Sequence, residues 1–116
     1  MTITRIGGNA INARVDIHGN VAYLSGIVAD DKSVGLADQT RQVLAKIDKH
    51  LADARTSKSR LLSATVYLAD VSKKEEMNAV WSNWIDPGNP PVRAAVGAEL
   101  SSPTTLVEIM VTAATD

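Results

Sequence analysis

Apolar and polar residues alternate with a period of two along several short stretches of the chain. This spacing is typical of β-strands that bury one face of a sheet. Gly19-Asn20 separates two of these stretches and suits the tight turn of a hairpin. We therefore predict six strands, over Thr2–Ile6, Ala13–His18, Val21–Val28, Arg60–Asp70, Val92–Leu100 and Thr105–Ala113.

Two other stretches place their apolar residues three and four positions apart, as amphipathic helices do. The first is predicted to begin at a Ser33 cap and to end near Ala54. The second follows Ser72 and Glu75, which have the spacing of a capping box. Its apolar stripe consists of Met77, Val80, Trp81, Trp84 and Ile85.

The predicted order of elements, β-β-β-α-β-α-β-β, indicates a single two-layer α+β domain over residues 1–116. We expect a mixed six-stranded sheet with both helices packed on one face. The residues predicted for the other face are too apolar for open water, and such a face marks an interface. They are Val21, Tyr23, Ser25, Ile27, Ser63, Thr65, Tyr67, Ala95, Leu106 and Met110. The sequence therefore predicts a homo-oligomer.

The last two predicted strands, Val92–Leu100 and Thr105–Ala113, are joined by the turn-forming residues 101–104. So short a connection predicts an antiparallel hairpin. In that hairpin Arg93 and Glu108 point to the same face, about four residues and roughly 13 Å apart. They would flank one cleft, or each would meet a partner from another chain. The alternative is that both are ordinary polar residues of an exposed sheet face.

Composition excludes several classes of function. The chain has 12 Lys and Arg against 13 Asp and Glu, no Cys, and two widely separated His. This argues against a dedicated nucleic-acid binder, a thiol nucleophile and a metal site. No stretch approaches the ~20 apolar residues of a membrane span, and we find no signal peptide. A cytoplasmic protein without metal or cofactor is the expectation.

The region from Pro90 to Met110 resembles the signature of the RidA/YjgF family of reactive-intermediate (enamine/imine) deaminases, once called endoribonuclease L-PSP-like. The matching residues are Pro-Val-Arg-Ala-Ala-Val-Gly-Ala-Glu-Leu from Pro91 and Leu-Val-Glu-Ile from Leu106, with a Ser-Gly at Ser25. The similarity extends over the whole chain. It implies a chorismate-mutase-like fold and a homotrimer whose sheets form an inner barrel, with clefts between subunits.

The resemblance also implies roles for five residues. Arg93 would hold the carboxylate of a 2-imino acid, and the backbone N–H of Ala95 would bind the same carboxylate. Glu108 would orient the attacking water, and Ser25 and Gly26 would lie near the imine. Ser25 has a second interpretation, as a small sheet residue packed at a subunit contact. The implied products are a 2-keto acid and ammonia.

Two positions depart from the family pattern. Relatives carry a Tyr near the start of the second strand, whereas residues 11–14 contain none, and Ala95 stands where relatives often have Cys. Arg14 either contributes to substrate binding in place of the Tyr or is a surface charge. The departures indicate a divergent member. Its function would be that of a 2-iminobutanoate/2-iminopropanoate deaminase-like hydrolase or of a non-catalytic trimer that binds small carboxylates. A ribonuclease or chaperone-like role is a third option, against which the near-neutral charge speaks.

Overall fold

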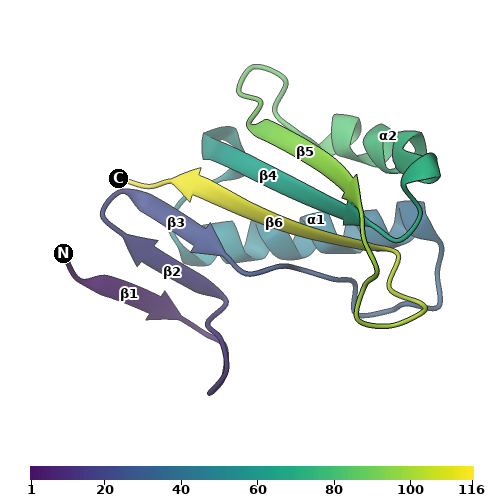
Figure 1. Cartoon of the computed structure of the whole chain (residues 1–116). Coiled ribbons are helices and arrows are strands. Elements are labelled where there is room, and N and C mark those ends of the chain that lie inside the picture. The colour runs from purple at the N-terminus through teal and green to yellow at the C-terminus, as the bar shows by residue number, and fades with distance from the viewer.

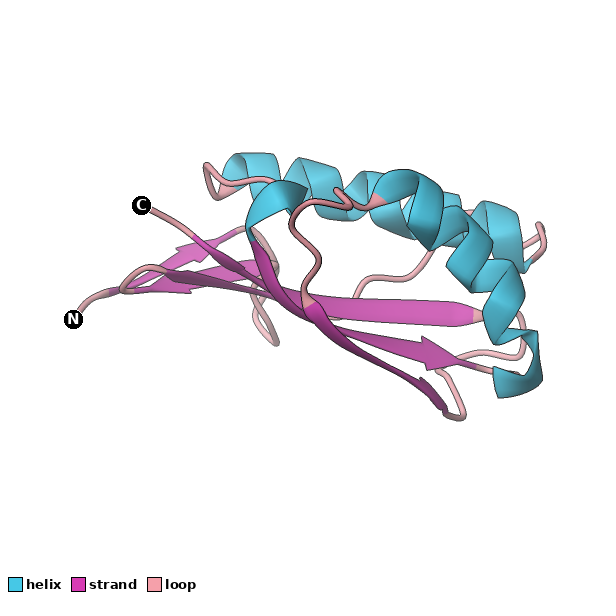
Figure 2. Ribbon diagram, turned by 90° about the horizontal axis from the view of Figure 1, so that it is seen from above, coloured by secondary structure: helices cyan, strands magenta, loops and turns pink.

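The computed structural model describes residues 1–116 and contains one six-stranded mixed sheet with two helices on the same side of it (Figures 1 and 2). This confirms the predicted fold class and the predicted order of elements. The strands are β1 Ile3–Ile6, β2 Val15–His18, β3 Val21–Leu24, β4 Leu61–Leu68, β5 Val92–Gly97 and β6 Val107–Ala114. The helices are α1 Leu36–Asp53 and α2 Lys74–Trp84, and 3-10 turns occur at Lys58–Arg60 and Val71–Lys73.

The strand order β1-β2-β3-β6-β4-β5 shows that the predicted hairpin is wrong. β4 lies between β5 and β6, pairing with β5 in parallel and with β6 antiparallel. β4, α2 and β5 form a β-α-β unit, whose helical crossover lets consecutive strands run in parallel. The connection from Gly97 to Val107 passes the end of β4.

The core lies between the sheet and the two helices. Ala64, Val66 and Leu68 of β4 are buried and lie opposite Val111, Ile109 and Val107 of β6. The buried apolar faces of the two helices complete the core. They consist of Leu36, Val43, Leu44, Ile47 and Leu51 of α1 and of Met77, Val80 and Trp81 of α2. The apolar spacing therefore identified the buried helix faces correctly.

The helix starts differ from the prediction because one acidic residue precedes each of them. Ser33 donates to Asp31 and does not cap α1, which begins after Gly35 without a side-chain cap. Ser72 likewise donates to Asp70, and this carboxylate caps the turn that leads into α2. In both cases the Asp two residues upstream is the acceptor, in an Asx-type turn.

The sheet face away from the helices is uncovered (Figure 2). Tyr23, Val96 and Met110 are 49%, 40% and 43% exposed on this face. The sequence pattern had placed Tyr23 and Met110 there, but not Val96. Ile27, Ala95 and Leu106 were also predicted on this face but pack against the core.

The chain switches faces at two irregular points, which explains part of this difference. β3 ends at Leu24, and Ile27 then forms an isolated bridge with Ile109. A register shift between Leu61 and Ser63 buries Leu61 and exposes Leu62.

Neither helix is both long enough and apolar enough to cross a membrane.

Candidate functional site

Arg93 lies on the edge strand β5, on the helix side of the sheet. Its guanidinium donates to Asn78 Oδ1 at 2.7 Å, lies 3.8 Å from Met77 Sδ, and stacks 5.0 Å from the centre of the Trp81 ring. All three partners belong to α2 and none carries a negative charge. None of the four ion pairs of the chain includes Arg93. The guanidinium is therefore held in place while its charge stays available to a ligand.

Glu108 lies on the central strand β6, on the open side of the sheet, opposite Tyr67 of β4. It is half-buried and makes no ion pair within the chain. A Cβ atom built on Gly26 would collide with the Glu108 carboxylate, so only glycine leaves room for it there. The Glu108 carboxylate is thus positioned beside the backbone of Gly26.

Arg93 and Glu108 do not point the same way, and here the prediction from the sequence is wrong. Residues paired across a sheet project to the same side, and Arg93 is in register with buried Ala64, which faces the helices. Glu108 is in register with half-exposed Tyr67. Two strand spacings and three residues along β6 put the two positions roughly 14 Å apart. One chain cannot bring both charges to one small substrate.

The backbone of β5 adds a second donor near Arg93. The N–H of Ala98 donates to the carbonyl of Leu68 in β4. Because successive N–H groups of a strand point to opposite edges, those of Arg93 and Ala95 point away from β4. No strand follows β5 at that edge. Ala95 therefore offers an unpaired N–H on the same edge as Arg93, while its methyl group packs against the core.

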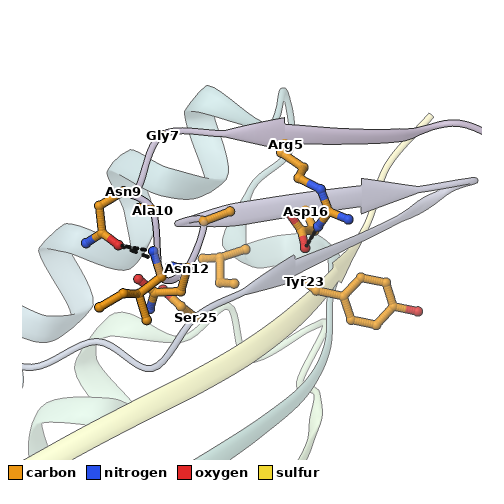
Figure 3. Close-up of a pocket in the computed structure, with 11 residues that line it drawn as sticks. Arg5, Gly7, Asn9, Ala10, Asn12, Asp16, Tyr23 and Ser25 are labelled. Carbon is orange, nitrogen blue, oxygen red and sulfur yellow. Dashed lines mark hydrogen bonds and ion pairs between the residues drawn. The ribbon is translucent and has the colours of Figure 1, made fainter.

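Ser25 lines the largest hollow of the chain, which has a volume of about 630 Å³ (Figure 3). The loop from Gly7 to Ala13 forms one wall, where Asn9 accepts hydrogen bonds from the N–H groups of Ile11 and Asn12. The Arg5–Asp16 ion pair lies at the other end. Arg93, Glu108 and Gly26 do not line this hollow. Ser25 and Gly26 are adjacent in sequence and yet open onto different spaces.

Arg14 is exposed, and its backbone carbonyl accepts from the N–H of Ser25. Its guanidinium fills the space above Gly7, where any side chain would collide with it. Arg14 also lines a second hollow together with Gly26. The structure thus places Arg14 beside Ser25 and Gly26 but not beside Arg93.

Comparison with known proteins identifies the family. A family model described as endoribonuclease L-PSP matches residues 9–115. A RutC family protein of Haemophilus ducreyi is 47% identical over 112 residues, which cover 97% of this chain and 96% of that protein. The RutC family protein YoaB of Escherichia coli is 40% identical over 114 residues, covering 98% and 99%.

A crystal structure of a YjgF family member from Neisseria meningitidis has a TM-score of 0.96 and 36% identity, covering 100% of this chain and 97% of that one. The chain belongs to the YjgF/L-PSP family. The resemblance seen in the sequence is thereby confirmed, as is the fold that it implied.

Within this YjgF/L-PSP fold, the contacts that hold Arg93 were not predicted from the sequence. Asn78 was not singled out, although it directly follows Met77 of the apolar stripe and so lies at the margin of the buried face of α2. Trp81 was predicted to serve the core, and it does, but it also stacks on the guanidinium. The one feature of the sequence that could have indicated this contact is the position of polar Asn78 at the margin of the apolar stripe.

Proposed function

We propose that the protein hydrolyses reactive 2-imino acids to 2-keto acids and ammonia. The observation that supports this most directly is the Arg93 guanidinium, which the neutral Asn78 side chain holds without an acidic partner. Guanidinium binds a carboxylate through two parallel hydrogen bonds, and the N–H of Ala95 at the same edge supplies a third donor. A small substrate with one carboxylate fits this set of donors.

The site would be completed by a second copy of the chain. Arg93 and Glu108 lie on opposite faces of one sheet, so a substrate held by Arg93 can reach only the Glu108 of another subunit. Tyr23, Val96 and Met110 leave the open face apolar enough to bury against a copy of itself. In a cyclic assembly each interface would then contribute one Arg93 and one Glu108. We propose a homotrimer, the assembly that the family resemblance implies.

The reaction needs little beyond positioning. Water, held by the Glu108 carboxylate, adds to the carbon of the C=N bond while the nitrogen takes up a proton. The C–N bond of the resulting carbinolamine then breaks, releasing ammonia and leaving a C=O group. A half-buried carboxylate without an internal partner can orient the water and accept its proton. Fixing substrate and water together removes much of the entropic barrier.

A mixing experiment tests both the activity and the shared site. Imine released by an amino-acid oxidase is followed in the presence of wild type, Arg93→Ala, Glu108→Gln, or the two variants co-expressed. Each single variant should be nearly inactive. In mixed trimers about one quarter of the interfaces would pair an intact Arg93 with an intact Glu108 by random assortment, restoring about a quarter of the activity.

Two outcomes would contradict different parts of the proposal. If the mixture stays inactive while each variant remains trimeric, the site is not shared between copies. If Arg93→Ala hydrolyses imine at the wild-type rate, the deaminase assignment itself is wrong. The Arg41→Ala variant is the control, because Arg41 is an exposed arginine of α1 that pairs only with Asp38.

A non-catalytic carboxylate-binding protein is the second candidate. The absence of Tyr from residues 11–14 and the presence of Ala95 instead of Cys favour it. This protein would bind 2-ketobutyrate or pyruvate in calorimetry through Arg93 and yet leave the rate of imine hydrolysis unchanged. A cytoplasmic location stays a prediction.

A further inference from the structure

A second hollow, of about 460 Å³, lies between α1 and the segment that follows β3. It is many times larger than the ~30 Å³ share of one water molecule. Eight residues line it, and four of them are basic: Arg14, Lys46, Lys49 and His50. Asp30 is the only acidic residue among the eight.

The charges around this basic hollow are not balanced. Lys46 is paired with Asp30 at 2.8 Å and also donates to the carbonyl of Val28 at 2.9 Å. Arg14 and Lys49 take part in none of the ion pairs of the chain. Two cations therefore remain without a counter-charge around one cavity. An anion that enters the hollow is stabilised by its attraction to both Arg14 and Lys49.

His50 provides the second, independent observation. It belongs to the last turn of α1, its residue is only 7% exposed, and its Nδ1 atom is buried without a hydrogen-bond partner. Buried polar atoms almost always have a partner. Burial lowers the pKa of His50, and the charges of Arg14, Lys46 and Lys49 lower it further, against the opposing effect of Asp53. The imidazole is thus kept uncharged inside a positive environment.

We propose that this basic hollow binds a small oxyanion, a phosphate group or a carboxylate, held by Arg14 and Lys49 with His50 beside it. The guanidinium of Arg14 would supply parallel hydrogen bonds and the Lys49 ammonium a point charge. The bound anion would favour a proton on His50, since a nearby negative charge stabilises imidazolium. Gly26 lines the basic hollow and also contacts Glu108, so the site adjoins the proposed water-binding carboxylate without depending on the deaminase function.

Imidazole NMR of the intact protein tests the proposal directly. The chain has two histidines, and exposed His18 on β2 serves as an internal reference for His50. Inorganic phosphate, acetate and sodium chloride are titrated at one ionic strength and at several pH values. Phosphate or acetate should shift the His50 signals saturably and raise the pKa of His50, with little change at His18. Equal shifts in all three salts would overturn the proposal.

The two anions separate the possible sources of the ligand. Saturation by phosphate alone identifies a phosphate group, and saturation by acetate as well identifies a general carboxylate site. Neither result depends on imine hydrolysis, so failure here leaves the proposed function standing.

Variants of the two free cations locate the binding. Lys49→Ala and Arg14→Ala should each weaken phosphate binding about tenfold, the usual effect of removing one charge-assisted hydrogen bond. Lys74→Ala is the control, because Lys74 is an exposed lysine of α2 that does not line the basic hollow. Far-UV circular dichroism confirms that the variants fold. Unchanged affinity in both Lys49→Ala and Arg14→Ala would contradict the proposal.

Discussion

The surroundings of Arg93 differ sharply from those of Glu108, although both charges belong to the same candidate site. Arg93 lies at the edge of the sheet, and its guanidinium is fixed by Met77, Asn78 and Trp81 of one helix. Glu108 lies on a central strand with a neighbour on both sides, and no side chain of its own chain binds its carboxylate. Only the missing side chain of Gly26 gives it room.

The difference indicates how each half of the site is positioned. The Arg93 half is fixed by side-chain contacts that a single subunit supplies, and it faces outward at an unpaired strand edge. The Glu108 half is fixed by the backbone of β6 and leaves its oxygens without a partner. The Arg93 guanidinium and the Glu108 carboxylate have opposite charges, and neither has an ion-pair partner within the chain. In the proposed assembly of copies, they would face each other across an interface.

The largest effect is expected when Arg93 is changed while its charge is kept. Arg93→Lys loses the parallel pair of hydrogen bonds, and a shorter-reaching ammonium cannot also bind Asn78. Binding of 2-ketobutyrate, measured by calorimetry, should weaken about 100-fold. Arg41→Lys on the exposed side of α1 should bind as the wild type does. If Arg93→Lys binds 2-ketobutyrate as tightly as the wild type, the paired hydrogen bonds of the guanidinium are not needed for binding.

A smaller loss is expected from Gly26→Ala, which perturbs the Glu108 half alone. The new methyl group would occupy the position of the carboxylate and force Glu108 to turn away. We expect imine hydrolysis to fall about tenfold, which is part of the roughly 100-fold or more that a positioned general base contributes, while 2-ketobutyrate affinity at Arg93 changes little. Gly35→Ala is the matched control, because a Cβ atom at Gly35 has open space around it. Equal rates for both variants would show that the position of Glu108 does not matter.

Asn78→Asp is expected to have a weaker effect on the Arg93 half. The new carboxylate would pair with the guanidinium at the 2.7 Å contact and partly neutralise it. Carboxylate affinity should fall about fivefold, since one oxygen of the introduced side chain would compete with the ligand for the same charge. Asn83→Asp places the same charge at an exposed position of α2 and should leave affinity unchanged. Stronger binding in Asn78→Asp would contradict the view that Asn78 keeps Arg93 available.

The sequence was a good guide where burial decides the structure. Period-two and period-3.6 spacing located all six strands and both helices, since each element must bury its apolar side. The predicted face was wrong at Ile27, which follows the end of β3 in an isolated bridge, and strict alternation also fails at Leu61, where the register of β4 shifts. No local pattern marks such a point, because it depends on how neighbouring strands pair.

The pairing of strands was the larger error, and it changed the description of the site. Residues 101–104 suggested a turn, and a hairpin placed Arg93 and Glu108 on one face. The actual insertion of β4 between β5 and β6 is a long-range choice that turn residues do not reveal. The strand pattern singled out Arg93 and Glu108 and the family resemblance implied their roles, whereas their separation onto opposite faces required the structure.

The smallest expected effect concerns pH and His50, which lines the basic hollow. Its folded-state pKa is lowered below the usual 6.5, mainly by burial and then by Arg14. The unfolded chain therefore takes up a proton at higher pH than the folded protein does, and stability falls as pH drops below about 6.5. His50→Gln should remove this part of the pH dependence in chemical denaturation between pH 7 and pH 5, whereas His18→Gln should not. Phosphate should reduce the same dependence in the wild type by favouring imidazolium. An identical pH dependence in wild type and His50→Gln would show that His50 is not held uncharged by its surroundings.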